Sequence, residues 1–258
     1  MAQTCRTELG DFLRSRRQKL SPESVGLPGG RKRRTPGLRR EEVAELAGIG
    51  MDWYGRLEQG RNVTPSAATV NSLAQALRLS PPEHAHLRAL AQNTARPPLV
   101  RESVPEPLRR LVESLDQPAY IASRRWDLLL WNTAAAEIFA TLCRRPQENR
   151  NVLLYMLTDP DARRLFEPEW AEEAQRMVAR FRATSDLQAG DPAFCDLVER
   201  LRQGSPEFGA WWAAHDVRSE GFGLKRLNHP QRGRLCFEYT AFEYHHDPAL
   251  VLLVYTLV

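Results

Sequence analysis

Apolar residues recur at helical spacing through the first hundred residues of the chain. The repeat places three or four apolar side chains on one face of each successive segment, which is typical of amphipathic helices. These faces are formed by Leu9, Phe12, Leu13 and Leu20; by Val43, Leu46 and Ala47; by Trp53, Tyr54 and Leu57; by Val70, Leu73, Ala74 and Leu77; and by Leu87, Leu90 and Ala91. Strand-like alternation is absent here. The pattern therefore predicts an all-α domain.

A different pattern begins after a proline-bearing stretch that contains Pro97, Pro98, Pro105 and Pro107. Short strands and helices follow one another, and the last three strand-like segments are joined by short turns. Strands are predicted at Tyr120–Ser123, Trp126–Trp131, Phe222–Arg226, Leu235–Ala241 and Leu250–Leu257, and helices at Thr133–Leu142, Trp170–Phe181, after Asp191 and after Ser205. Consecutive strands with short turns favour an antiparallel sheet, so this part belongs to the α+β class.

The two patterns divide the chain into two domains. We predict a helical domain over residues 1–95, a linker over residues 96–115 and an α+β domain over residues 116–258. A length of 258 residues suits two cores of ordinary size better than one.

Residues 39–60 have the spacing of a helix-turn-helix. Ala44 is small where two helices must cross closely, and Gly48 suits a left-handed turn after the first helix. Ile49 then closes the corner, while Tyr54 and Leu57 face inward from the second helix. An ordinary helical hairpin is the alternative interpretation, and the distribution of charge favours the helix-turn-helix.

Positive charge is concentrated in the helical domain. Residues 1–100 hold 16 Lys and Arg against 9 Asp and Glu, a net of +7, whereas the rest of the chain holds 20 against 23, a net of −3. This asymmetry favours a polyanion partner for the first domain alone. The basic residues that we expect to contact double-stranded DNA around the first helix of the motif are Arg31, Lys32, Arg33, Arg34, Arg39 and Arg40. A solvated loop is the alternative for the first four, and the last two oppose the helix dipole unless a phosphate docks there.

The second helix of the motif is expected to enter the major groove. Met51 suits contact with a thymine methyl group, and Asp52 suits a hydrogen bond from a cytosine amine. Trp53 is a candidate either for base contact or for the core. Arg56 and Arg61 are predicted to position phosphates rather than to read bases. The full set of candidates here is Gly50, Met51, Asp52, Trp53, Arg56 and Arg61.

The second domain holds five of the six tryptophans of the chain. A curved sheet covered by helices can enclose an apolar pocket, which aromatic side chains and a few polar groups usually line. The candidates for the wall of such a pocket are Trp131, Phe139, Trp211, Trp212, His215, Phe222, His229 and Phe237. Filling of an ordinary core by these residues is the alternative, and both interpretations stay open.

Residues 7–92 resemble the xenobiotic-response-element family of lambda-repressor-like helix-turn-helix regulators, and the MmyB-like regulators in particular. Residues 116–258 also resemble the MmyB-like effector domain. The matching stretches are Arg34–Gly48, Trp53-Tyr54 and Leu57–Arg61 in the first domain, and Trp131-Asn132, Ser205–Phe208, Trp212–Val217 and His229–Gly233 in the second. This chain has Arg39-Arg40 where the broader family often has Thr-Gln, and its recognition helix opens with Gly50-Met51 rather than a polar pair. The resemblance implies a PAS-like fold for the second domain and an apolar ligand, a fatty acid having been seen in the family.

No pattern of an enzyme, a metal site or a membrane protein emerges. His215-Asp216 are sequence neighbours that rarely face each other, and His245-His246 precede a turn at Asp247-Pro248. Phosphate loops, zinc-helix motifs and nucleophile elbows are absent. The four cysteines are widely spaced, and we find neither a signal peptide nor an 18-residue uncharged run. We therefore predict no catalytic residue, no metal ligand, no cofactor and no membrane span, in a cytoplasmic protein.

These observations together predict a DNA-binding transcription regulator whose second domain senses an apolar, fatty-acid-like small molecule. A homodimer is expected, because one helix-turn-helix contacts too few bases for useful specificity. The alternative is a DNA-binding regulator whose second domain is a protein-interaction or dimerisation module without a small ligand. An apolar cavity above about 300 Å³ favours the sensor, whereas a closed aromatic core favours the alternative.

Overall fold

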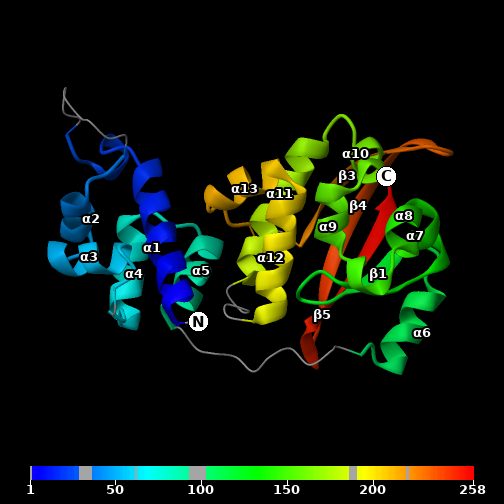
Figure 1. The fold of residues 1–258 in the computed structure, drawn as a ribbon, viewed down its shortest axis with the longest axis horizontal. Helices are drawn as coiled ribbons and strands as arrows, with labels where there is room; N and C mark the ends of the chain where they lie inside the picture. Colours follow the sequence, from blue (N-terminus) through cyan, green and yellow to red (C-terminus); the bar gives the residue numbers. More distant parts are fainter. Residues whose placement is uncertain (1, 29–36, 62, 93–102, 186–190, 219–220) are drawn as a thin grey trace.

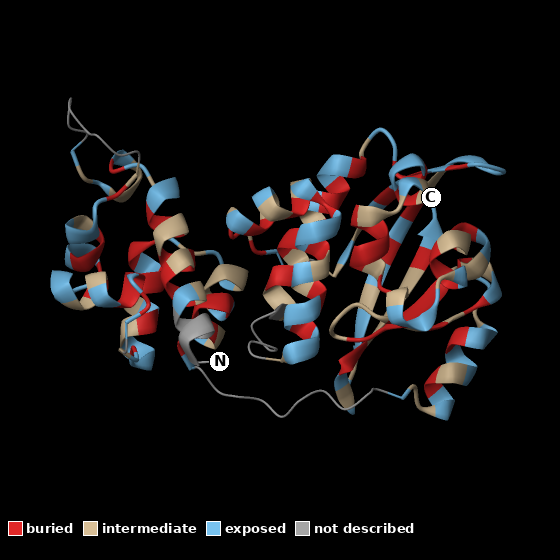
Figure 2. Cartoon of the chain, viewed as in Figure 1, coloured by how far each residue is buried: buried red, intermediate tan, exposed pale blue. Residues whose placement is uncertain are grey.

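The computed structural model describes residues 2–28, 37–61, 63–92, 103–185, 191–218 and 221–258. Figure 1 shows a helical head (residues 2–92) beside a C-terminal domain (residues 103–258) in which helices pack on a sheet. Each domain has its own buried core (Figure 2). The predicted combination of an all-α domain with an α+β domain containing an antiparallel sheet is therefore confirmed.

The described part of the head consists of α-helices and one short 3-10 turn around a single core. The elements are α1 (Ala2–Lys19), η1 (Glu23–Val25), α2 (Arg40–Leu46), α3 (Met51–Glu58), α4 (Ala67–Ala76) and α5 (Pro81–Gln92). Phe12 and Leu13 of α1 are completely buried against Leu73 of α4 and the other apolar residues that the helical repeat identifies. The five helices predicted from this repeat are all present.

The turn of the helix-turn-helix depends on Gly48, whose φ of +64° lies in the left-handed region that glycine tolerates best. The next residue, Ile49, donates its backbone N–H to the carbonyl oxygen of Ala44 at 2.9 Å and closes the corner. Ala44 and the inward-facing Tyr54 are buried between the two helices. The predicted left-handed turn and helix crossing are confirmed.

The C-terminal domain is built on a five-stranded antiparallel sheet with the strand order β2-β1-β5-β4-β3. Its strands are β1 (Ala119–Ala122), β2 (Leu128–Trp131), β3 (Phe222–His229), β4 (Gly233–Tyr244) and β5 (Asp247–Leu257). The last three strands follow one another as hairpins, as predicted. One face of the sheet, which includes Phe237, Tyr239 and Tyr255, points into the core.

Seven helices and one 3-10 turn come between the second and third strands in the described chain. They are α7 (Thr133–Ile138), α8 (Ala140–Arg144), η2 (Gln147–Asn149), α9 (Val152–Thr158), α10 (Pro160–Leu165), α11 (Trp170–Ser185), α12 (Pro192–Gly204) and α13 (Pro206–Ala213). Asp191 and Ser205 accept backbone N–H groups at the starts of α12 and α13, as N-cap residues do. In Figure 1, α11, α12 and α13 lie between the sheet and the head.

Two elements differ from the sequence prediction. The helix predicted over residues 133–142 is broken at Phe139, where φ is −111° and ψ is 41°. The predicted linker over residues 96–115 contains a helix, α6 (Glu106–Ser114). Leu108 and Val112 of α6 pack on the second face of the sheet, against Ile121 and its neighbours. The second half of that stretch therefore belongs structurally to the C-terminal domain.

Candidate functional site

Helix α3, the second helix of the helix-turn-helix, presents a short exposed face to solvent. Met51 is 54% exposed, and Asp52 and Arg56 are exposed beside it, after the exposed N-cap Gly50. Trp53 is half-buried and packs against the core of the head. The structure thus gives Trp53 a packing role and leaves Met51, Asp52 and Arg56 accessible to a groove.

Carboxylates of the protein surround the two arginines at the start of α2. Glu42 accepts the backbone N–H of Arg39 at 2.7 Å, and Glu41 accepts a hydrogen bond from the Arg39 side chain at 3.2 Å. Arg40 donates through Nε to Glu58 at 2.9 Å. These carboxylates offset the unfavourable interaction of the two cations with the helix dipole, even without a bound phosphate.

Glu58, at the end of the recognition helix, has a fully buried side chain that joins α1, α2 and α3. Arg17 donates hydrogen bonds to both carboxylate oxygens at 2.8 and 2.9 Å, and Arg40 of α2 donates a further one. Burial alone would raise the pKa of Glu58, but the hydrogen bonds and charges of Arg17 and Arg40 hold it below its usual value. The orientation of α3 against α1 and α2 therefore depends on a charged, hydrogen-bonded contact.

The remaining predicted DNA contacts are only partly described. Arg61 follows α3 and is exposed. The basic run Arg31–Arg34 lies outside the described residues.

A cavity of about 630 Å³, partly open to the surface, lies between the sheet and helices α8, α9 and α11. Most of its wall is apolar, and Trp126, Phe139 and Tyr255 are among its aromatic members. The complete lining is Tyr120, Ala122, Ser123, Arg124, Trp126, Phe139, Leu142, Val152, Tyr155, Met156, Phe166, Met177, Arg180, Ala183, Thr184, Arg218, Lys225, Tyr239, Ala241, Glu243, Pro248, Val251, Leu253 and Tyr255. This volume lies within the range of small-molecule sites.

Phe139 is the one predicted wall residue that lines this cavity, and four of the others pack elsewhere in the domain. Phe237 is buried edge-on against Tyr255. Trp131 lies beneath the guanidinium of Arg150 at 4.7 Å. Trp211 packs against Trp170, and Trp212 stacks on Phe208. These four aromatic residues fill core space, which is the alternative that the sequence left open.

The other three predicted wall residues also lie away from the cavity. Phe222 is 67% exposed on the face of β3 that points away from the core. His229 ends β3, where its Nδ1 accepts the backbone N–H of Arg232 at 3.1 Å and fixes the hairpin turn. His215 is buried beside the head. Their positions follow from strand parity, turn formation and domain contact, respectively.

The sequence prediction missed all four basic side chains that line the cavity, which are Arg124, Arg180, Arg218 and Lys225. Lys225 is only 4% exposed and is paired with the carboxylate of Glu173, and its burial lowers its pKa to about 8 although Glu173 counteracts part of this effect. Arg180 donates to the hydroxyl of Tyr239 and lies 5.5 Å from the ring of Trp126. The Nε of Arg180 is buried and makes no hydrogen bond with the described residues.

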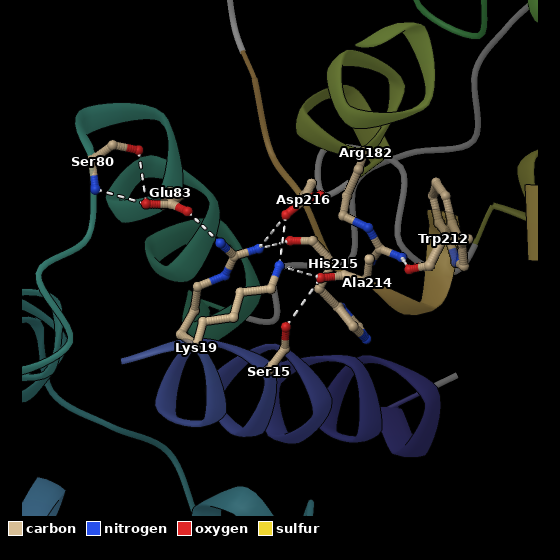
Figure 3. Close-up of polar contacts among 10 residues, drawn as sticks. Ser15, Lys19, Ser80, Glu83, Arg182, Trp212, Ala214, His215 and Asp216 are labelled. Atoms are coloured by element: carbon tan, nitrogen blue, oxygen red, sulfur yellow. Dashed lines mark hydrogen bonds and ion pairs between the residues drawn. The ribbon is translucent and has the colours of Figure 1, made fainter. Parts of the chain in front are cut away.

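The head and the C-terminal domain meet through α1 and the segment that follows α13 (Figure 3). The carbonyl oxygen of Ala214 accepts hydrogen bonds from Ser15 at 3.1 Å and from Lys19 at 2.8 Å. Lys19 also pairs with Asp216 at 2.6 Å, and Arg16 donates to the carbonyl oxygen of His215. The two domains therefore form a specific polar interface.

The described residues also bear on metal, catalytic and membrane-spanning sites. They contain no group of three or more His, Cys, Asp or Glu side chains suited to a metal ion. Asp216 faces Lys19 rather than the imidazole of His215 as an orienting partner. None of the described helices combines the length and apolar character that a bilayer span requires.

An exposed recognition helix on a basic head and an apolar cavity in the attached domain define a DNA-binding regulator with a ligand-binding domain. The chain belongs to the family described as MmyB-like transcription regulator ligand binding domain, whose model matches residues 104–258. A model described as helix-turn-helix domain matches residues 8–87. No curated protein matches the sequence.

Proposed function

We propose that the chain is a sequence-specific transcription regulator whose cavity binds an apolar molecule with an acidic head group, of the fatty-acid kind. The observation that carries this proposal is the combination of an apolar wall with basic side chains in one cavity. Arg124, Arg180, Arg218 and Lys225 line it, against one acidic lining residue, Glu243. An aliphatic chain suits the wall, and a carboxylate suits the cations.

Arg180 is the best candidate for the head-group contact. It lines the cavity from α11, and its guanidinium carries further N–H donors besides the one that binds the hydroxyl of Tyr239. Lys225 is already paired with Glu173, so it contributes less than Arg180 to the attraction of an acidic group. We place the carboxylate beside Arg180 and the chain against the aromatic wall.

On the DNA side, we propose that two copies of the chain bind paired half-sites in the cytoplasm. The exposed residues Met51 and Asp52 contact base edges in the major groove, while Arg39, Arg56 and Arg61 contact phosphates. Arg31–Arg34 remain candidates for the backbone or minor groove. Replacement of Arg56 by Ala then weakens binding to all sequences and reduces the salt slope by about one.

Thermal unfolding with dodecanoate tests the ligand proposal, with dodecanol as the uncharged control. At a hundred times the dissociation constant, dodecanoate should raise the melting temperature by about 5 °C or more. Dodecanol, which lacks the carboxylate, should raise the melting temperature less. Arg180→Met removes the proposed head-group contact and should reduce this difference, whereas the paired variant Lys225→Met with Glu173→Gln leaves the net charge unchanged and serves as its control. A flat response to fatty acids of all chain lengths, with no lipid in native mass spectra, contradicts the proposal.

A second candidate function rests on the outer face of the sheet. Phe222, Leu224 and Phe242 are each more than half exposed there. Contiguous apolar surface of this kind favours a protein-interaction or dimerisation module. If the cavity binds no lipid while Phe242→Asp abolishes self-association in light scattering, this second function replaces the first.

A further inference from the structure

Two segments of the C-terminal domain, helix α11 and residues 214–218, contact both the cavity and the head. Helix α11 contributes Met177, Arg180 and Thr184 to the cavity wall. On the side facing the head, Arg182 pairs with Glu8 of α1 at 3.2 Å. Ala183 does both, because it lines the cavity and also packs against the apolar core of the head.

The second segment, residues 214–218, runs from the head to the cavity. The carbonyl oxygens of Ala214 and His215 accept hydrogen bonds from α1, and Val217 is buried within the apolar core of the head. The next residue, Arg218, lines the cavity. Its backbone N–H donates to Ala179 of α11 at 3.1 Å, so the two segments are joined.

The interface holds both segments in defined conformations. Arg182 is 1% exposed, lies 3.8 Å from the ring of Trp212 and donates to the Trp212 carbonyl oxygen (Figure 3). His215 has a φ of +53°, a left-handed conformation that a residue other than glycine adopts only where its surroundings hold it. Arg16 of the head binds the carbonyl oxygen of that residue. Undocking of the head therefore frees the segment that ends at the cavity.

We infer that α11 and residues 214–218 form a coupling element, through which occupation of the cavity and docking of the head change each other's free energy. This inference rests on the proposed ligand-binding function and adds the route by which that function reaches the head. In Figure 1 the recognition helix α3 lies on the side of the head away from this interface. Docking consequently acts on the orientation of the head, not by covering α3.

Linkage requires that the effect be reciprocal, so a change in docking must alter ligand affinity. Lys19→Glu places a negative charge against Asp216 and the Ala214 carbonyl oxygen at an exposed site, where folding of the head is little affected. The dissociation constant for dodecanoate, measured by calorimetry on the full chain, should change at least threefold. Lys19→Glu combined with Asp216→Lys should recover part of the change. Arg232→Glu is the matched control, because it reverses an exposed cation paired with Glu137 inside the C-terminal domain.

A second experiment tests the coupling without a ligand. Val251→Trp fills part of the cavity from β5, at a position whose strand neighbours are Ala122 and Glu243. Amide hydrogen exchange in residues 13–19 and 210–218 should change at least threefold in this variant. Such a change, together with no dodecanoate binding to the unaltered chain, supports the coupling and removes the fatty-acid proposal. Binding of dodecanoate with unchanged exchange in both segments, and an unchanged dissociation constant in Lys19→Glu, overturns the coupling and leaves the ligand proposal standing.

Discussion

Glu58 shows how one buried charge sets the geometry of the DNA-binding surface. Its carboxylate lies between Arg17 of α1 and Arg40 of α2, while its own helix carries the exposed residues Met51 and Arg56. A buried ion pair of this kind adds little net stability over a packed apolar contact, but removal of one partner leaves the other charge uncompensated. Glu58 is therefore a residue that positions α3 and does not itself contact DNA.

Replacement of Glu58 by Ala should destabilise the head by about 3–5 kcal/mol, because Arg17 is then buried without its partner. Urea unfolding followed by circular dichroism measures this change. Exposed Glu41→Ala on α2 serves as the control and should cost less than about 0.5 kcal/mol. Equal stability of the Glu58→Ala and Glu41→Ala variants would show that the contact is dispensable.

The cationic residues of the cavity were difficult to predict for a related reason. Lys225 directly follows Leu224 in the strand, so its side chain points to the opposite face. A lysine in a strand normally indicates the face exposed to solvent. Its inward position is possible because Glu173, 52 residues earlier in the chain, supplies a carboxylate. A partner so distant in sequence leaves no local signal.

At the scale of single elements, strand β3 corrects the prediction that Phe222 lines the pocket. The face of the strand that carries Phe222 is exposed, and the other face is buried. Side chains alternate along the strand, with Phe222 and Leu224 exposed and Lys225 and Leu227 buried. Because the period is two, the choice of face for one residue determines all the others. An apolar residue on an exposed face gives the same sequence pattern as one in the core.

A pair of substitutions tests the facing of β3. Leu227→Ala should destabilise the protein by about 2–5 kcal/mol, since Leu227 is 2% exposed. Phe222→Ser on the opposite face should change the stability by less than about 0.5 kcal/mol. Chemical denaturation of both variants at low protein concentration gives the comparison. A larger loss for Phe222→Ser would reverse the assignment of the two faces.

The accuracy of the element predictions followed the amphipathic character of each segment. The helices of the head have one apolar and one polar face, and the helical period identified them all. Helix α9 is apolar almost throughout, from Leu153 to Leu157, and is buried, so it has no such period. Helix α6 follows Pro105 and contains Pro107, and these residues favoured a linker although proline is well tolerated in the first turn of a helix.

At the scale of the whole molecule, two buried histidines, His86 of α5 and His215 after α13, predict that docking of the head depends on pH. Burial, followed by the charge of Arg182, lowers the pKa of His86 and of His215 to about 3. An exposed imidazole has a pKa of about 6.5, so both histidines are neutral in the docked state, and His215 at the interface should take up a proton when the domains separate below that pH. The other charged groups facing them are Arg16, Lys19, Glu8 and Glu83.

Docking should therefore be strongest above about pH 6.5 and should weaken progressively as the pH falls from 6.5 towards 3. Hydrogen exchange of residues 210–218, corrected for the intrinsic effect of pH, measures this trend. His215→Asn is the control, because asparagine tolerates the left-handed conformation and does not titrate. If this variant keeps the full pH dependence, His215 is not one of the groups responsible.

The domain interface itself could not be read from the sequence. Ser15, Arg16 and Lys19 follow one another on the polar side of an amphipathic helix, which predicts solvent contact. Their partners lie about two hundred residues later, in a segment of irregular structure. The hydrophobic pattern predicts two domains and their order, whereas their contact depends on side chains that only the fold brings together.

We propose that one molecule bound in the C-terminal cavity changes the affinity of the head for DNA. The most direct measurement is the dissociation constant of the full chain for an operator selected from random DNA, at one salt concentration, with and without saturating dodecanoate. A coupling free energy of ordinary size predicts a change of about five- to 150-fold. Calorimetry verifies that the cavity is saturated. An operator affinity unchanged within twofold at saturation would contradict the proposed coupling between ligand binding and DNA binding.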